Sequence, residues 1–230
     1  MKKNLLLPAV LFSFLTIISC SSSRNATDDF KQTTANHQVV ALLPIQLAYS
    51  GELPKEMKPD EIKALQERES EKIQEQLYFE LLRNNHPRKR YSKVITYQSL
   101  QTTNSVLKEK GISTEDIYKK DAREIATLLN VDAVLFTKIE RRILIADKTN
   151  IAINAGQRTV DWVLSAAGKN IRTPNLPAGR IYFSIALNEA EKGNTLWVVN
   201  DATEYGSKYT NEDVIRFFAE YAARKIPYRK

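Results

Sequence analysis

Short apolar runs alternate with amphipathic helical segments over the first half of the chain, and this alternation restricts the fold most. Residues 38–46 (QVVALLPIQ) form an apolar run with β-branched residues, which predicts a buried strand. A long helical stripe begins at Pro59, and two more apolar runs, at residues 94–97 and 133–136, are separated by helical segments. Strands that alternate with helices predict an α/β fold with a parallel or mixed sheet and helices on its faces.

The second half of the chain has the pattern of a hairpin followed by a helix. Residues 180–190 and 195–200 are strand-like and flank a predicted turn at residues 191–194. Thr210 and Asp213 have the spacing of a capping box. The apolar residues that follow recur at helical spacing: Val214, Phe217, Phe218, Tyr221 and Ala222. We therefore predict a single mixed-sheet α/β sandwich domain.

The amino-terminal segment has the pattern of a lipoprotein signal peptide. Two lysines precede an apolar run over residues 5–18, which is shorter than the roughly 20 residues that a spanning helix needs. Residues 17–20 (IISC) resemble the lipobox of bacterial lipoproteins. The resemblance implies cleavage before Cys20 and acylation of that cysteine with palmitate-type chains, which would bind the mature protein to membrane lipid.

These patterns divide the chain into three predicted parts. Residues 1–19 are the cleaved signal peptide, residues 20–37 are a lipidated flexible tether rich in Ser, Thr and Asn, and residues 38–230 are the α/β domain. Cys20 is the only cysteine, so the acylated chain would form no disulfide. Ser21 rather than Asp follows Cys20, which favours the outer membrane, with the domain facing the periplasm.

Composition and motifs argue against several classes of function. A net charge of +7 is mildly basic, so we expect no nucleic-acid partner. His37 and His86 have no Cys, His or acid at metal-ligand spacing, and the phosphate-loop and nucleophile-elbow motifs are missing. The acids of the long helix fit a solvated face with basic partners: Glu67, Glu69, Glu71, Glu75 and Glu80. We therefore expect no enzyme activity, metal or cofactor, although a carboxylate pair acting on glycan stays an alternative.

One basic cluster is a candidate binding patch between the long helix and the next strand. It consists of Arg83, His86, Arg88, Lys89, Arg90, Tyr91 and Lys93. Such a cluster suits acidic lipid headgroups, glycan phosphates or an acidic protein face, and a solvated loop is the simpler alternative. The aromatic residues Trp162, Tyr182 and Trp197 are expected in the core. Trp162 lies in the stretch with the least pattern, and if exposed it would mark a contact site.

Three motifs resemble a family of envelope lipoproteins. Residues 40–45 (VALLPI) are similar to the opening strand of lipoproteins related to the curli-secretion lipoprotein CsgG, of activator lipoproteins of penicillin-binding proteins, and of the amino-terminal domain of TolB. Residues 122–136 resemble their helix–strand pattern and residues 188–197 their hairpin, with departures at Asn130 and Lys192. The resemblance implies an α/β sandwich and a role in envelope assembly, secretion or synthase regulation, and it carries over no catalytic residue.

Together these patterns predict a membrane-anchored, non-catalytic accessory factor of envelope assembly or secretion. Its partners would be membrane lipid, through Cys20, and an envelope protein or a second copy of itself. A regulator of a peptidoglycan synthase is one alternative, for which residues 21–37 would reach at most about 60 Å. A subunit of an oligomeric secretion pore is another, although charged residues interrupt the alternating pattern that its membrane hairpins would need in residues 143–171.

Overall fold

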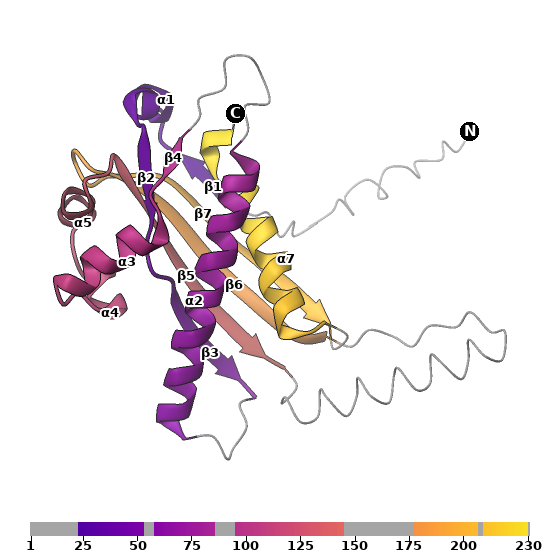
Figure 1. The fold of residues 1–230 in the computed structure, drawn as a ribbon. Helices are drawn as coiled ribbons and strands as arrows, with labels where there is room; N and C mark the ends of the chain where they lie inside the picture. The colour runs from indigo at the N-terminus through magenta and orange to yellow at the C-terminus, as the bar shows by residue number, and fades with distance from the viewer. Residues whose placement is uncertain (1–22, 53–57, 86–94, 145–176, 207–208, 230) are drawn as a thin grey trace, which may run out of the picture.

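A seven-stranded mixed sheet forms the centre of the molecule (Figure 1). The computed structural model describes residues 23–52, 58–85, 95–144, 177–206 and 209–229. The strands are β1 (Ser23–Ala26), β2 (Val39–Leu42), β3 (Gln46–Gly51), β4 (Thr96–Tyr97), β5 (Ala133–Ile143), β6 (Pro177–Glu189) and β7 (Thr195–Gly206). Their order is β1-β7-β6-β5-β2-β4, and β3 also pairs with β5.

The directions of the strands confirm the predicted mixed α/β class. β2 and β3 both run parallel to β5, and β4 runs parallel to β2. β5, β6 and β7 pair antiparallel, as the predicted hairpin requires, and β1 is antiparallel to β7. The sheet therefore combines a parallel half, built by strand–helix alternation, with an antiparallel half built by the hairpin.

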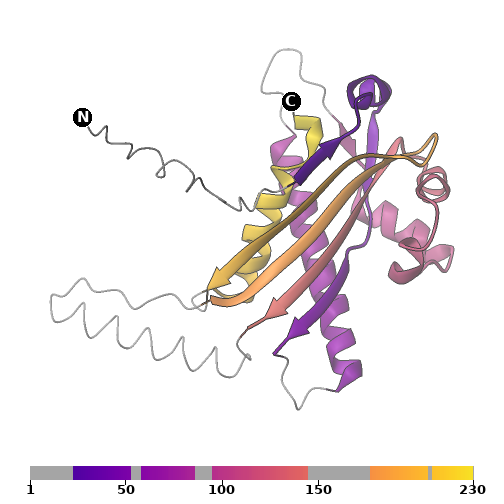
Figure 2. The ribbon, with the colours of Figure 1, turned by 180° about the vertical axis from the view of Figure 1, so that it is seen from behind.

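Helices cover the two faces of the sheet unequally. α2 (Pro59–Asn84) and α7 (Asn211–Ala223) lie on one face, whereas α3 (Leu100–Glu109), α4 (Thr114–Ile117) and α5 (Ala122–Leu129) gather at one end of the other (Figures 1 and 2). Figure 2 shows the rest of that second face, on β3, β5, β6 and β7, with no described helix over it. The remaining short elements are α1 (Phe30–Thr33), η1 (Thr34–Asn36) and η2 (Pro227–Arg229).

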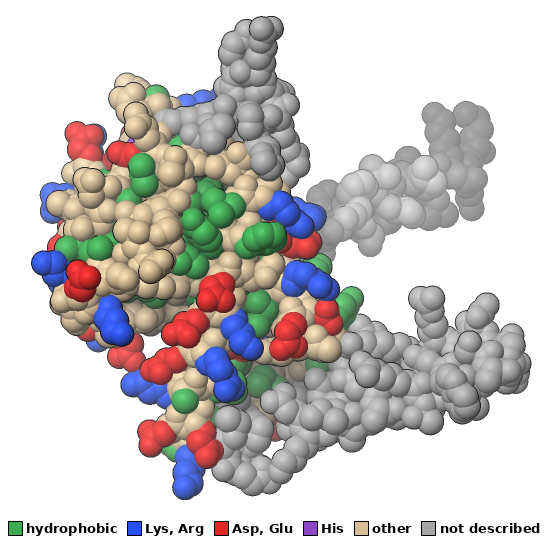
Figure 3. Space-filling view, in the orientation of Figure 1, with side chains coloured by type: hydrophobic (Ala, Val, Ile, Leu, Met, Phe, Trp, Pro, Cys, Tyr) green, Lys and Arg blue, Asp and Glu red, His purple; other side chains and the backbone are tan. Residues whose placement is uncertain are grey.

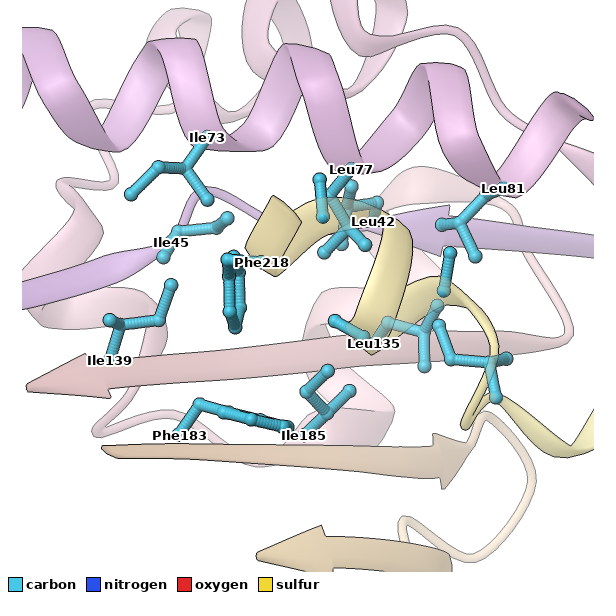
Figure 4. Close-up of a cluster of buried hydrophobic side chains, with 14 of the residues drawn as sticks. Leu42, Ile45, Ile73, Leu77, Leu81, Leu135, Ile139, Phe183, Ile185 and Phe218 are labelled. Carbon is cyan, nitrogen blue, oxygen red and sulfur yellow. The ribbon is translucent and has the colours of Figure 1, made fainter. Parts of the chain in front are cut away.

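The main core lies between the sheet and the helix pair α2 and α7. Ile73, Leu77 and Leu81 recur every four residues along α2 and face the strands (Figure 4). They meet Leu42, Leu135 and Ile185 from the sheet and Phe218 from α7, all at most 5% exposed. Burial of each such side chain stabilises the fold by about 1.5–3 kcal/mol, so this pairing decides how α2 and α7 dock.

α7 forms as its sequence predicts. Thr210 accepts a hydrogen bond from the backbone N–H of Asp213, and Asp213 caps the N–H of Thr210 in return, which completes the predicted capping box. The prediction for Phe217 is wrong, because this side chain is 52% exposed while its neighbour Phe218 is 1% exposed. The buried stripe instead includes Ile215 and Ala219, which lie on the side of Phe218 that faces α2 and the sheet.

A second, smaller core holds α3, α4 and α5 on the other face. Ile117, Ile125 and Leu129 pack with Ala41 and Val134 of the sheet. α4 and α5 are separate helices, because Asp121 accepts a hydrogen bond from the N–H of Arg123 and starts a new helix. Asn130 then ends α5 in a left-handed conformation (φ 53°), the position where the related motif has Gly.

From Ser23 onward the chain forms regular secondary structure, whereas the sequence predicted a flexible tether over residues 20–37. Residues 23–26 add strand β1 to the edge of β7, and α1 and η1 follow before β2 begins. His37 is buried, and its Nδ1 lies 2.6 Å from the hydroxyl of Tyr228 in η2. The sequence SRNA has no strand pattern, so pairing with β7 is what orders it. The predicted signal peptide and Cys20 lie outside the described residues.

Three more side chains lie elsewhere than the sequence predicted. Glu69 and Glu80 of α2 are 2% and 1% exposed rather than solvated, because each pairs with an arginine, Arg141 and Arg83 respectively. Tyr182 is half-buried on the uncovered sheet face rather than in the core. Trp197, at 3% exposed, is in the core as predicted.

Candidate functional site: a groove beside the β3 edge

Pro44 divides the predicted strand over residues 38–46 into β2 and β3. Proline has no N–H to donate, so backbone pairing with β5 is interrupted there. The hydroxyl of Tyr118, between α4 and α5, bridges the interruption. This hydroxyl donates to the carbonyl of Thr137 (2.5 Å) and accepts from the amides of Thr137 (3.1 Å) and Gln46 (3.3 Å). It thereby joins β5 to the start of β3, and β3 continues in register with Lys138.

β3 keeps one edge without a strand partner among the described residues. The amide of Gln46 faces Tyr118, and the amide of Glu52 donates to Ile143 of β5 at 2.8 Å. Backbone groups alternate along a strand, so the N–H and C=O groups of Leu47 and Tyr49 face away from β5. A free strand edge of this kind is a template on which an extended peptide can add a further strand.

A groove of about 1250 Å³ lies beside this edge. Gln46, Leu47 and Ala48 contribute to its floor, and its walls come from residues 63–74 of α2 and from the α3–α4 region, residues 104–117. The lining continues along the sheet at β5, β6 and β7. Small-molecule sites are typically about 300–1,000 Å³, so a groove of this size suits a polypeptide better.

The walls of the groove are tied to its floor by side-chain hydrogen bonds. The hydroxyl of Ser70 in α2 donates to the carbonyl of Ile45 at 2.5 Å. The amide of Gln74 donates to the carbonyl of Leu42 (3.2 Å) and also bonds with Asn104 of α3. These bonds fix α2 and α3 against the link between β2 and β3, so the groove is a formed feature of the domain.

The groove carries charges of both signs. Lys63, Glu67 and Glu71 line it from α2, and Lys138 and Glu140 line it from β5. Figure 3 shows acidic and basic side chains intermingled over the α2 face of the molecule. A mixed lining favours a polar, extended partner over a strongly acidic or strongly basic one.

The chemistry of the described residues gives no metal cluster. No three or more His, Cys, Asp or Glu side chains within the described ranges come close enough together to hold a metal ion. Ser70 uses its hydroxyl on a backbone carbonyl, and His37 is bonded to Tyr228. In the same part of the chain, no helix combines the length and apolar character that crossing a membrane requires.

Arg83 is the one residue of the predicted basic patch that lies within the described residues. Its guanidinium forms ion pairs with Glu80 (2.5 Å) and Glu220 (3.5 Å), and so joins the last turn of α2 to α7. This contact gives Arg83 a structural role. The other patch residues (His86, Arg88, Lys89, Arg90, Tyr91 and Lys93) lie outside the described residues, so their binding role stays a prediction.

The groove was not predicted from sequence, because it joins segments that are far apart in the chain. One local signal points to it. Gly51 ends β3 with φ +86°, and a Cβ there would lie 2.1 Å from the carbonyl oxygen of Ile143. The glycine therefore marks where β3 ends against β5.

Comparisons with known proteins give structural neighbours at low similarity. No protein-family model matches the sequence, and no curated protein matches it. The lipoprotein GNA1162 from Neisseria meningitidis is 11% identical with a TM-score of 0.44, and the match covers 81% of this chain and 94% of that one. The PelC dodecamer from Paraburkholderia phytofirmans is 9% identical with a TM-score of 0.40 (89% and 95% covered). The LpoB C-terminal domain from Salmonella enterica is 12% identical with a TM-score of 0.35 (76% and 93% covered).

Because these identities and scores are low, we take no functional residue from the matched structures. The resemblance to CsgG and TolB stays a prediction from sequence.

Proposed function

We propose that this chain is a lipid-anchored accessory factor of the bacterial envelope that binds an extended segment of a partner protein along β3. The observation that carries the proposal is the free edge of β3 on the floor of a polypeptide-sized groove. The anchor is the acylated Cys20 that the lipobox predicts, at the outer membrane and facing the periplasm.

Binding would occur by strand addition. Backbone groups of the partner would pair with the outward N–H and C=O groups of Leu47 and Tyr49, each bond contributing about 0.5–1.5 kcal/mol. Alternate side chains of the partner would then point toward α2 and toward α4, where charges of both signs line the walls. Backbone pairing supplies affinity in this arrangement, and the two walls supply specificity.

The position of β1 limits how far the domain can stand from the membrane. Cys20 precedes Ser23 by three residues, which span at most about 10 Å when extended. The partner therefore has to reach the membrane that holds Cys20. This short link weighs against a synthase regulator that must extend across the periplasm, and favours an accessory factor that works beside its own membrane.

Photo-crosslinking in the native envelope tests the proposal. A photoreactive phenylalanine analogue at Ala48, which is exposed in the groove, is expected to form an adduct with a separate envelope protein. The same analogue at Glu212, exposed on α7 and outside the groove, is the matched control and is expected to form none. In a Cys20→Ser background the Ala48 adduct should decrease, because the domain leaves the membrane.

Equal labelling from the two positions, or no adduct from Ala48, would contradict binding at the β3 edge. An adduct with the mass of two copies of this chain would identify the partner as a second copy of the chain rather than a separate protein.

A further inference from the structure

Phe217 is an exposed aromatic residue on the side of α7 next to β7. Its ring stacks on Tyr221, with the ring centroids 6.4 Å apart and the planes 12° from parallel. Tyr221 donates its hydroxyl to Asp201 of β7 at 2.5 Å. The stacked pair is thus fixed beside β7, with 52% of Phe217 open to solvent.

The chain enters the domain at the same place. β1 pairs with β7 so that Ser23 lies opposite Asn200, which precedes Asp201 in the strand. Since Cys20 is three residues before Ser23, its sulfur can lie no more than about 10 Å along the chain from this edge. Acyl chains on Cys20 would therefore enter the membrane close to Phe217.

The side chains around Phe217 have the composition of a membrane–water interface. Phe217, Tyr221 and the C-cap residue Arg224 are spaced i, i+4 and i+7, so they share one side of α7 and its carboxyl end. The side chain of Arg224 is 60% exposed and pairs with Glu220 at 3.5 Å. The Nζ of Lys225 lies 4.5 Å from the centroid of the Tyr221 ring and pairs with Asp201 at 3.2 Å, and 13% of this side chain is exposed. An exposed aromatic ring beside an exposed arginine, as with Phe217 and Arg224, is typical of the headgroup region.

We infer that the anchor-side face of α7 (Phe217, Tyr221 and Arg224) rests on the phospholipid surface that holds Cys20, with the Phe217 ring among the headgroups. The inference rests on the proposed function, because it requires the acylated cysteine. Burial of one phenylalanine ring is too weak to hold the protein on a membrane alone. Its effect, once the lipid holds the chain, is to orient the domain.

This orientation turns the β3 edge of the groove away from the membrane. In the order β7-β6-β5-β3 the free edge of β3 is three strands from β7, or about 14 Å at 4.7–4.9 Å per strand. With the β7 side on the membrane, the β3 edge faces the periplasm, where an extended partner segment can reach it.

Tryptophan fluorescence in brominated vesicles tests the orientation. Full-length protein, purified in its lipidated form, is inserted in vesicles of phosphatidylethanolamine and phosphatidylglycerol with brominated acyl chains, which quench nearby tryptophan. Phe217→Trp is compared with Phe79→Trp, a matched control on α2 whose native side chain is 57% exposed. Wild-type emission, from Trp162 and Trp197, is subtracted from both. Both variants replace exposed rings, and equal thermal midpoints confirm that both fold.

We expect the added emission of Phe217→Trp to be quenched and shifted to shorter wavelength, and that of Phe79→Trp to remain as in unbrominated vesicles. Protein that floats with the vesicles but shows equal quenching, or none, at the two positions would overturn the orientation and leave the lipid anchor standing. Protein that does not float would overturn the anchor and the orientation together.

Discussion

Replacing Arg141 with Ala is expected to lower the free energy of unfolding by about 3–5 kcal/mol, because it leaves a buried carboxylate without its guanidinium. Arg141 lies on β5 and forms an ion pair with Glu69 of α2, which is 2% exposed. The same guanidinium donates to Asn211 at the start of α7 (2.5 Å) and to the hydroxyl of Tyr205 on β7 (3.1 Å). One side chain thus joins the sheet to both helices of the main core.

Urea denaturation of Arg141→Ala and of Arg180→Ala compares the loss of a buried ion pair with the loss of an exposed one. Arg180 on the neighbouring strand pairs with Glu204, but the two side chains are 42% and 53% exposed. An exposed pair contributes about 0–1 kcal/mol, so Arg180→Ala should change stability little. If Arg141→Ala also changed it by less than about 1 kcal/mol, the network would not support the fold as described.

Tyr118→Phe is expected to cost about 1–3 kcal/mol, the typical penalty for leaving buried polar groups without a partner. The substitution removes only the hydroxyl, and with it the bonds to the carbonyl and amide of Thr137 and to the amide of Gln46. The break at Pro44 would then have no bridge to β5, so amide hydrogen exchange should increase at Gln46 and Thr137 in particular. Tyr209→Phe, at a position 52% exposed, is the control and should stay within about 0.5 kcal/mol of wild type.

The alkaline pH dependence of stability gives a second measure of Tyr118. Burial raises the pKa of its hydroxyl above the ordinary value of 10.0. A raised pKa means that the folded state holds a proton that the unfolded state releases, so stability is full below pH 10 and decreases as the pH rises above it. Tyr118→Phe should show a smaller decrease than wild type above pH 10. An unchanged decrease would show that Tyr118 ionises in the folded protein as it does in the unfolded chain.

Local patterns predicted the elements whose residues specify their own structure. The capping box at Thr210 starts α7, and the β6–β7 hairpin turns at Gly193 with φ +72°. β1 could not be predicted in this way, because its residues, three of them polar, become a strand only through pairing with β7. The burial of Glu69 likewise depends on Arg141, which is far away in the sequence. The burial of Glu80 depends on Arg83, on the next helical turn.

The candidate site was less accessible to sequence reasoning than the fold. Pro44 divides the predicted strand over residues 38–46, and nothing near it in the sequence shows that Tyr118, 74 residues later, bonds to the backbone there. The exposure of Phe217 was missed because helical spacing alone does not tell which flank of an apolar stripe a neighbouring element covers. Such features depend on tertiary contacts, which periodicity does not record.

Mass spectrometry of the mature amino-terminal peptide tests the central claim, that a lipid on Cys20 holds the sheet at the membrane. Trypsin cleavage after Arg24 should release a peptide that begins at Cys20 and carries acyl chains, and Cys20→Ser should abolish it together with the membrane-bound fraction. An unmodified peptide, or one that begins before Cys20, would contradict the claim.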